Sequence, residues 1–227
     1  MKKIKHTFEE KYFTDHYSHI SDFSEKAEKT VTNWFKGLFH TINSYSKILN
    51  GTNKTAIEFG CATGVASKLL ADSGYNVTST DISLYAVKKA KKLYSNIHFL
   101  KHDIQDPFIS KIKYDLVLAL DVIEHLENPN KAIKNMYNLI KPNGLVLCST
   151  PNDYAHERKV PTHISVKTPQ EWKKLFYDAG FKSVEIRQKT FLPFLYRLHW
   201  RLTFSLPFAI NLHFPIICSP VFIFARK

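Results

Sequence analysis

The chain has 227 residues and 44% of them are hydrophobic, which is enough to bury the core of one domain with additions and excludes the disordered class. Its three cysteines, Cys61, Cys148 and Cys218, lie far apart, which argues against a cysteine-rich metal site and favours reduced thiols in the cytosol. The formal charge of +12 is compatible with binding to nucleic acid or to an anionic membrane. No block of five or six like charges occurs, however, so scattered lysines on solvated helix faces are the preferred interpretation.

The first fifty residues predict a helical segment without a secretory signal. The start, MKKIKHTFEE, is basic but lacks the apolar stretch of a signal peptide. From Ala27 to Leu49 apolar residues recur in steps of three and four, which is typical of one face of a long helix, and Asn50 and Gly51 end it. We expect residues 1–50 to form a helical lid segment before the domain of residues 51–227.

After Lys54 short β-prone runs alternate with helical stretches. The predicted elements are strand 55–60, helix 64–74, strand 76–81, helix 83–94, strand 97–103, strand 114–121, helix 128–140, strand 145–151, helix 168–180 and strand 182–188. The helix after Thr168 has the clearest start, because Thr168 can cap it, Pro169 follows and Glu171 completes a capping box. Such alternation predicts an α/β fold with a parallel sheet and helices on both of its faces.

The strongest functional signal is AIEFGCATG at residues 56–64, where a strand leads through a turn of small residues into a helix. Gly60, Ala62 and Gly64 let the backbone come close to a ligand, and a helix start offers free N–H groups. The segment lacks the Gly-x-Gly-x-x-Gly pattern that a dinucleotide pyrophosphate requires. It therefore suits a nucleoside without a pyrophosphate.

Acidic side chains stand at the ends of successive predicted strands. Asp81 ends the second strand about twenty residues after the small-residue turn, where a carboxylate can accept both ribose hydroxyls. Asp103 and Asp121 end the next two strands, and Glu58 lies in the first. Any one of them could be an ordinary turn former or helix cap. Together they indicate a ligand site at one edge of the sheet.

In this order the segments resemble the class I S-adenosylmethionine-dependent methyltransferases, from about Thr55 to Gln188. IEFGCATG resembles the first motif of that family, STDIS the second, KHDIQD the third and YDLVLALDVIEHLENP the fourth, with LIKPNGLVLCSTPN after it. The resemblance implies a Rossmann-like, seven-stranded methyltransferase sheet that is mostly parallel with an antiparallel last strand. It also implies S-adenosyl-L-methionine as the cofactor.

The resemblance further implies the contacts of that cofactor. The residues expected to bind it are Glu58, Gly60, Cys61, Ala62, Gly64, Asp81, Ile82, Asp103, Ile104, Leu120 and Asp121. The turn of residues 60–64 would pass under the methionine and ribose, and Glu58 would orient this turn or the ammonium group. Asp81 would hold the ribose hydroxyls and Ile82 would pack on the adenine. Asp103 and the backbone of Ile104 would contact the adenine edge, and Leu120 with Asp121 would border the methionine end. Ala62 stands where many members have glycine.

The segments VIEHLENP, STPN and THISVKTPQEWKKLFYDAGF narrow the resemblance to small-molecule methyltransferases, of the ubiquinone-type O-methylation kind (methyltransferase type 11 and 23) and of related surface-polysaccharide pathways. Methyl transfer to oxygen is helped by a base that removes the proton of the acceptor, and histidine titrates in the useful range. His125 and His163 are therefore the candidate catalytic residues, with a purely structural role as the alternative. Glu124, His125 and His163 could also hold a divalent metal, but the sequence contains no coordination geometry, so no metal ligand is assigned.

We predict a methyltransferase that acts on an oxygen of a small-molecule acceptor, which is lipid-linked, quinone-like or a sugar. An RNA methyltransferase is the alternative that the charge suggests, but LDVIEH differs from the segment with which enzymes methylate exocyclic base nitrogens, so nucleic acid is not the expected partner. A non-catalytic cofactor-binding module and a dinucleotide-dependent dehydrogenase stay open. The oligomeric state is not specified.

The last apolar stretch raises the question of a membrane span, because Leu202 to Ala225 carries no formal charge and is long enough to cross a bilayer. Three prolines, Asn211 and His213 argue against a spanning helix. The resemblance instead implies that VFIFARK is the final antiparallel strand, which makes residues 190–220 a hydrophobic insertion. We expect this insertion to be a substrate lid or, because aromatics surround Arg197 and Arg201, an element in contact with an anionic bilayer. The expected location is the cytoplasm, with peripheral contact to the inner membrane face as the alternative.

Overall fold

The computed structural model of the chain describes residues 8, 10–16, 25–192, 195–211 and 219–227. Predictions that fall on the other residues lie outside the described part of the chain. They concern Cys218, His213 and sections of the predicted lid and insertion.

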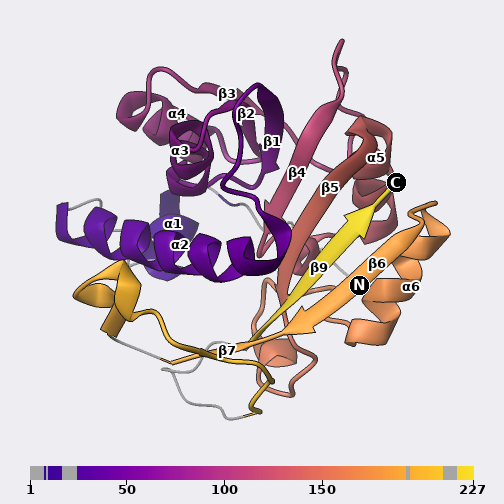
Figure 1. The fold of residues 1–227 in the computed structure, drawn as a ribbon. Helices are drawn as coiled ribbons and strands as arrows, with labels where there is room; N and C mark the ends of the chain where they lie inside the picture. Colours follow the sequence, from indigo (N-terminus) through magenta and orange to yellow (C-terminus); the bar gives the residue numbers. More distant parts are fainter. Residues whose placement is uncertain (1–7, 9, 17–24, 193–194, 212–218) are drawn as a thin grey trace.

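A seven-stranded sheet in the order β3-β2-β1-β4-β5-β9-β6 runs through the described chain (Figure 1). Its strands are β1 (Lys54–Phe59), β2 (Tyr75–Asp81), β3 (His98–Lys101), β4 (Tyr114–Leu120), β5 (Ile140–Pro151), β6 (Ser183–Gln188) and β9 (Pro220–Arg226). The pairs formed by β1 to β5 are parallel, whereas β9 is antiparallel to both β5 and β6. The predicted Rossmann-like sheet and its antiparallel last strand are confirmed.

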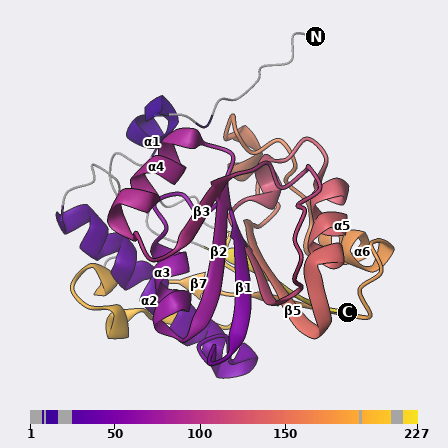
Figure 2. The same ribbon diagram turned by 90° about the horizontal axis from the view of Figure 1, so that it is seen from above.

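Helices cover both faces of the sheet, as Figure 2 shows from above. They are α1 (Glu10–His16), α2 (Glu25–Ser46), α3 (Val65–Asp72), α4 (Leu84–Leu93), α5 (Pro129–Leu139) and α6 (Pro169–Asp178). Apolar side chains of α5 and α6 form one buried cluster with the sheet, and those of α2, α3 and α4 form a second cluster on the other face. The predicted capping box of α6 is present, with Thr168 accepting from the N–H of Glu171 and Glu171 accepting from the N–H of Thr168.

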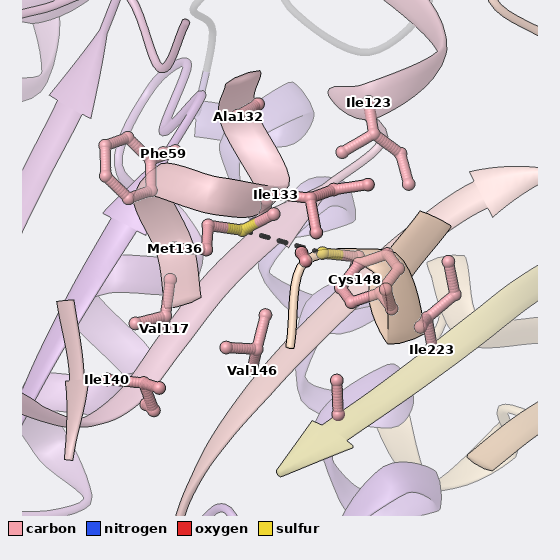
Figure 3. Packing of buried hydrophobic residues seen from close by; sticks show 14 of the residues in the cluster. Phe59, Val117, Ile123, Ala132, Ile133, Met136, Ile140, Val146, Cys148 and Ile223 are labelled. Carbon is pink, nitrogen blue, oxygen red and sulfur yellow. Dashed lines mark hydrogen bonds between the residues drawn. The ribbon is translucent and has the colours of Figure 1, made fainter. Parts of the chain in front are cut away.

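The central strands are buried on both faces because neighbouring residues of each strand point to opposite clusters. In β4, Val117 belongs to the cluster with α5 and α6, whereas Leu116 and Leu118 belong to the cluster with α2. Figure 3 shows the first of these clusters, where the Cys148 thiol contacts the sulfur of Met136 at 3.9 Å. Burial of this kind at roughly 25 cal/mol per Å² of apolar surface is the main stabilising contribution to the fold.

The first fifty residues divide into two parts in the structure. Helix α2 buries Leu38, Phe39 and Ile42 against the sheet, so it is a core helix of the domain. Short α1 lies further from the sheet, and the side chains described near it contact η1 (Ile123–His125) and α4. The lid function therefore stays a prediction for the residues before α2.

The apolar C-terminal stretch contains core strand β9 and, before it, a described part of the predicted insertion. This part contains β7 (Thr190–Phe191), η3 (Leu195–Arg197), η4 (Trp200–Leu202) and β8 (Ser205–Leu206), and β7 pairs with β8. Figures 1 and 2 both place it beside α2. Among the described residues no helix combines the length and the apolar character needed to cross a membrane.

Candidate active site

The carboxyl ends of the parallel strands bring the predicted cofactor residues to one edge of the sheet. Between β1 and α3 the backbone adopts positive φ at Gly60 (72°), Ala62 (45°) and Gly64 (81°). A Cβ atom on Gly60 would lie 2.3 Å from Cγ2 of Val122, and one on Gly64 would lie 2.8 Å from Cζ of Phe99. Both positions therefore require glycine, whereas Ala62 adopts its left-handed conformation with a side chain.

Asp81 is the acidic residue that this turn holds most tightly. The side chain is buried at the end of β2, where Oδ2 accepts from the N–H of Ala62 and Oδ1 from the N–H of Ser83, both at 2.8 Å. Ile82, the next residue, is 43% exposed although it is a large apolar side chain. A fixed carboxylate beside an exposed apolar surface is what an adenosine needs for its ribose and its ring. The residues present thus fit S-adenosylmethionine.

Glu58 at the end of β1 and Cys61 in the turn are both buried. The hydroxyl of Ser67 on α3 donates to Oε2 of Glu58 and also contacts the hydroxyl of Ser79 on β2, so Glu58 joins three elements. Burial, with a smaller contribution from the charge of Asp81, raises the pKa of Glu58 to about 7 against the lowering effect of the hydrogen bond from Ser67. Burial also raises the pKa of the Cys61 thiol well above its usual range, while its N–H donates to the carbonyl of Thr80 at 3.0 Å.

Asp103 and Ile104 follow β3 at the same edge. Oδ1 of Asp103 accepts from the N–H of Gln105 at 2.8 Å. Ile104 is buried, and its carbonyl accepts from Nδ2 of Asn135 at 2.8 Å. The carboxylate of Asp103 is thereby oriented by its own loop, next to a backbone segment that α5 holds in place.

Leu120 and Asp121 end β4, and the backbone of Asp121 is left-handed with φ 52°. The N–H of Asp121 donates to the carbonyl of Ser149 at 3.0 Å, and the hydroxyl of Ser149 donates to Oδ1 of Asp121 at 2.7 Å. Leu120 is buried, but Asp121 is exposed. The protein atoms around Asp121 nevertheless raise its pKa by desolvation, against the lowering effects of Ser149 and His163. This combination is expected of a carboxylate that lines a recess.

His125 and His163 come together beside Asp121, although 38 positions separate them in the sequence. Their ring centroids lie 5.0 Å apart. His125 is in η1 (Ile123–His125), and its Nδ1 lies 2.8 Å from the carbonyl oxygen of Thr162. Since a carbonyl can only accept, we assign the proton to Nδ1, which makes Nε2 the acceptor of the neutral ring.

Glu124 completes this group, which we call the His–Glu cluster (Glu124, His125 and His163). One ligand atom from each residue lies within 4.8 Å of the others. Glu124 is 1% exposed, its Oε2 makes no hydrogen bond with the described residues, and burial followed by the charge of Asp121 raises its pKa well above the usual range. Nδ1 of His163 lies 3.1 Å from Oε2 of Glu157 without forming a hydrogen bond. Imidazole and carboxylate together are suitable ligands for a divalent transition metal, so the cluster offers a metal site that the sequence could only suggest.

Several residues around the site carried no signal in the sequence. Phe8 lies with its ring centroid 5.5 Å from that of His125, and Phe13 of α1 lies 5.9 Å from Tyr85 of α4. Thr162 orients His125, and Ser149 orients Asp121. Only the position of Ser149, in the STPN segment at the end of the fifth sheet strand, could have suggested such a role.

Comparison with known proteins agrees with this geometry. The Methyltransf_23 family model, described as a methyltransferase domain, matches residues 32–186. A ubiquinone biosynthesis O-methyltransferase of Rickettsia canadensis is 33% identical over an alignment of 147 positions, gaps included, that covers 56% of this chain and 62% of the relative. The match thus spans about three fifths of the length of that relative.

Two solved structures show the same fold at low sequence identity. The YcgJ protein of Bacillus subtilis superimposes with a TM-score of 0.65 at 12% identity, over 83% of this chain and 98% of its own. Phosphoethanolamine N-methyltransferase 2 of Haemonchus contortus, solved with phosphomonomethylethanolamine and S-adenosylhomocysteine, also gives 0.65, at 15% identity, over 86% of this chain and 52% of its own.

Proposed function

The chain belongs to the family of S-adenosylmethionine-dependent methyltransferase domains, and on this premise we propose that it transfers a methyl group to an oxygen of a small-molecule acceptor. One observation supports the cofactor site best. At the end of β2, buried Asp81 accepts two backbone hydrogen bonds, and the next residue is the exposed Ile82. The names of the curated relatives support an oxygen on a quinone-like acceptor.

S-adenosylmethionine, when bound, supplies an activated methyl group on a sulfonium. Asp81 binds the ribose hydroxyls, Ile82 packs on the adenine, and Asp103 with the backbone of Ile104 binds the adenine edge. The turn of residues 60–64 lies under the ribose and methionine, and Leu120 with Asp121 borders the methionine end.

The His–Glu cluster lies on the acceptor side. Nε2 of His125 is the acceptor nitrogen because Nδ1 faces the carbonyl of Thr162, so His125 removes the proton of the acceptor hydroxyl as the methyl group is transferred. His163, at a centroid distance of 5.0 Å, positions the same group or shares this role. General base catalysis of this kind contributes about 10²–10⁴-fold to rate.

The unpaired, buried Oε2 of Glu124 favours a second role for the same cluster. A divalent cation bound by Glu124, His125 and His163 would bind the acceptor oxygen and lower the pKa of its hydroxyl, so that the hydroxyl would lose its proton to solvent water and would not need a histidine base. The two roles differ in one measurement: chelation abolishes transfer in the metal role and leaves it unchanged in the base role.

The test is methyl transfer from labelled S-adenosylmethionine to a panel of catechol, lipid-linked quinol and sugar acceptors. We expect turnover on at least one of them, with none on RNA. Salt-dependent RNA binding together with RNA methylation would support the nucleic-acid alternative instead. Cofactor binding without turnover on any class would identify a non-catalytic module.

A further inference from the structure

The insertion before β9 has an unusual composition. Residues 190–220 contain no aspartate or glutamate, and their lysine or arginine residues are Arg197 and Arg201 alone. The family match ends at residue 186, so this segment lies outside the part that defines the family. The insertion is therefore a feature of this chain that the methyltransferase assignment does not explain.

The insertion also exposes large apolar side chains within a short distance in the sequence. Those with more than a third of their surface exposed are Leu192, Leu195, Leu198, Phe204 and Phe208, and Leu198 reaches 71%. Single exposed apolar residues are common, but here five of them lie within seventeen residues, which makes this segment a candidate interaction surface. We call these five residues, with Arg197, Trp200 and Arg201, the apolar–basic surface.

Helix α2 holds this surface in place. The ring of Trp34 lies with its centroid 5.0 Å from Phe191 and 5.2 Å from Tyr196, and His40 lies 5.4 Å from Trp200. Thr203 packs directly against Gly37, because a Cβ atom added to Gly37 would lie only 1.9 Å from Oγ1 of Thr203. These contacts anchor the described part of the insertion, residues 190–192 and 195–211, on α2.

A pocket of about 300 Å³ opens beside the surface, between α2, α3 and η4. Lys36, His40 and Trp200 line it, together with Asp72, whose carboxylate is paired with Lys68 at 2.5 Å. The guanidinium of Arg201 lies 5.4 Å from the centroid of the Trp200 ring. Cationic groups around an aromatic side chain at the border of an apolar surface suit the headgroup region of an anionic lipid.

The insertion begins and ends at the same sheet edge as the candidate active site. The N–H of Lys189 donates to the carbonyl of Pro220, and Nδ2 of Asn152, just after β5, contacts the carbonyl of Ser219 at 2.5 Å. Ser149, three residues before Asn152, bonds Asp121. The insertion and the His–Glu cluster thus share one edge of the sheet. A membrane bound by the insertion would therefore lie on the side from which an acceptor reaches the cluster.

We propose that the apolar–basic surface docks this protein on an anionic lipid bilayer. The exposed leucines and phenylalanines enter the interface, and Arg197 and Arg201 bind the anionic headgroups, with Trp200 at the boundary. Charge complementarity favours a lipid surface over a second copy of this chain, because the partner surface would carry the same arginines. The docking does not depend on the proposed methyl transfer.

Flotation of the full chain with vesicles tests the proposal. We expect binding to phosphatidylcholine vesicles that contain phosphatidylglycerol, weaker binding to pure phosphatidylcholine, and loss of binding at high salt. Leu198→Ser combined with Phe204→Ser should lower the bound fraction, and Arg201→Glu should weaken binding about tenfold. The matched controls are Ile109→Ser, at a side chain that is 96% exposed between β3 and β4, and Lys111→Glu.

Absence of binding to both vesicle types, or an equal effect of the control variants, would overturn the proposal. A dimer in light scattering that Leu198→Ser dissolves, without vesicle binding, would assign the surface to a second copy instead. Titration of S-adenosylhomocysteine into each variant keeps the two proposals separate, because its affinity should be unchanged by the surface variants.

Discussion

Glu58 offers a quantitative test of how the cofactor turn is built, through the substitution Glu58→Gln. Burial raises the pKa of this carboxyl from 4.5 to about 7. The folded protein therefore binds the proton more tightly than the unfolded chain, and this stabilisation is complete below pH 4.5 and is lost as the pH rises through 7. A difference of about 2.5 between the two pKa values corresponds to about 3 kcal/mol of free energy.

The assay is urea unfolding of wild type and Glu58→Gln over a series of pH values. Between about pH 5 and pH 8.5 we expect the free energy of unfolding of the wild type to fall by roughly 2.5 kcal/mol relative to the variant, because glutamine does not titrate. Taking the difference removes the contributions of Asp121 and Glu124, which also have raised pKa values. A difference that stays constant with pH would refute the assignment of a buried, protonated Glu58.

The same variant separates the two roles predicted for Glu58. If it orients the turn through Ser67, glutamine preserves that contact and the affinity for S-adenosylhomocysteine stays within about threefold of wild type. If it binds the ammonium group of the ligand, loss of the charge weakens binding by about tenfold or more. Isothermal titration calorimetry distinguishes these results.

His125→Ala should lower turnover by about 10²-fold or more while cofactor affinity stays nearly unchanged, and unaltered turnover in both His125→Ala and His163→Ala would return the pair to structural roles. If the His–Glu cluster binds a catalytic metal, chelation with EDTA should remove activity and added divalent ions should restore it. Activity that survives chelation would instead support the base role. Gly60→Ala should lower the free energy of unfolding by about 2 kcal/mol and weaken cofactor binding, because its Cβ would overlap Val122 in a left-handed backbone; a chemical denaturation curve equal to wild type would contradict the conformation of the turn. Gly37→Ala should release the insertion from α2, seen as faster amide exchange around Thr203, and unchanged exchange would show that the contact is not needed.

The sequence predicted the sheet well because its signals are local. Continuous apolar runs such as the one in β4 report burial on both faces, and the Thr168 cap and Gly180 mark the ends of α6 within the chain. The final strand was also predictable, but only through the family resemblance, since VFIFARK by itself could equally be part of an apolar helix. The residues predicted to bind the cofactor lie at strand ends, and the position of a strand end can be read from the sequence without any knowledge of long-range contacts.

The remaining site depends on contacts between distant segments. The proximity of His125 and His163 is set by the loop of residues 152–168, where the carbonyl of Thr162 meets His125 and the N–H of Ser165 meets the carbonyl of Glu124. The spacing of these residues in the sequence does not predict that the loop of residues 152–168 returns to contact η1. The same holds for Phe8 near His125 and for the contact of Thr203 with Gly37, both of which depend on tertiary packing.

The proposed function depends first on Asp81 and the turn of residues 60–64 forming a site for S-adenosylmethionine. The most direct test is calorimetric titration of S-adenosylhomocysteine into wild type, Asp81→Ala and the surface control Asp72→Ala. We expect one site in the wild type, an affinity about tenfold or more weaker in Asp81→Ala, and no change in Asp72→Ala. No binding by the wild type, or equal affinity in Asp81→Ala, would contradict it.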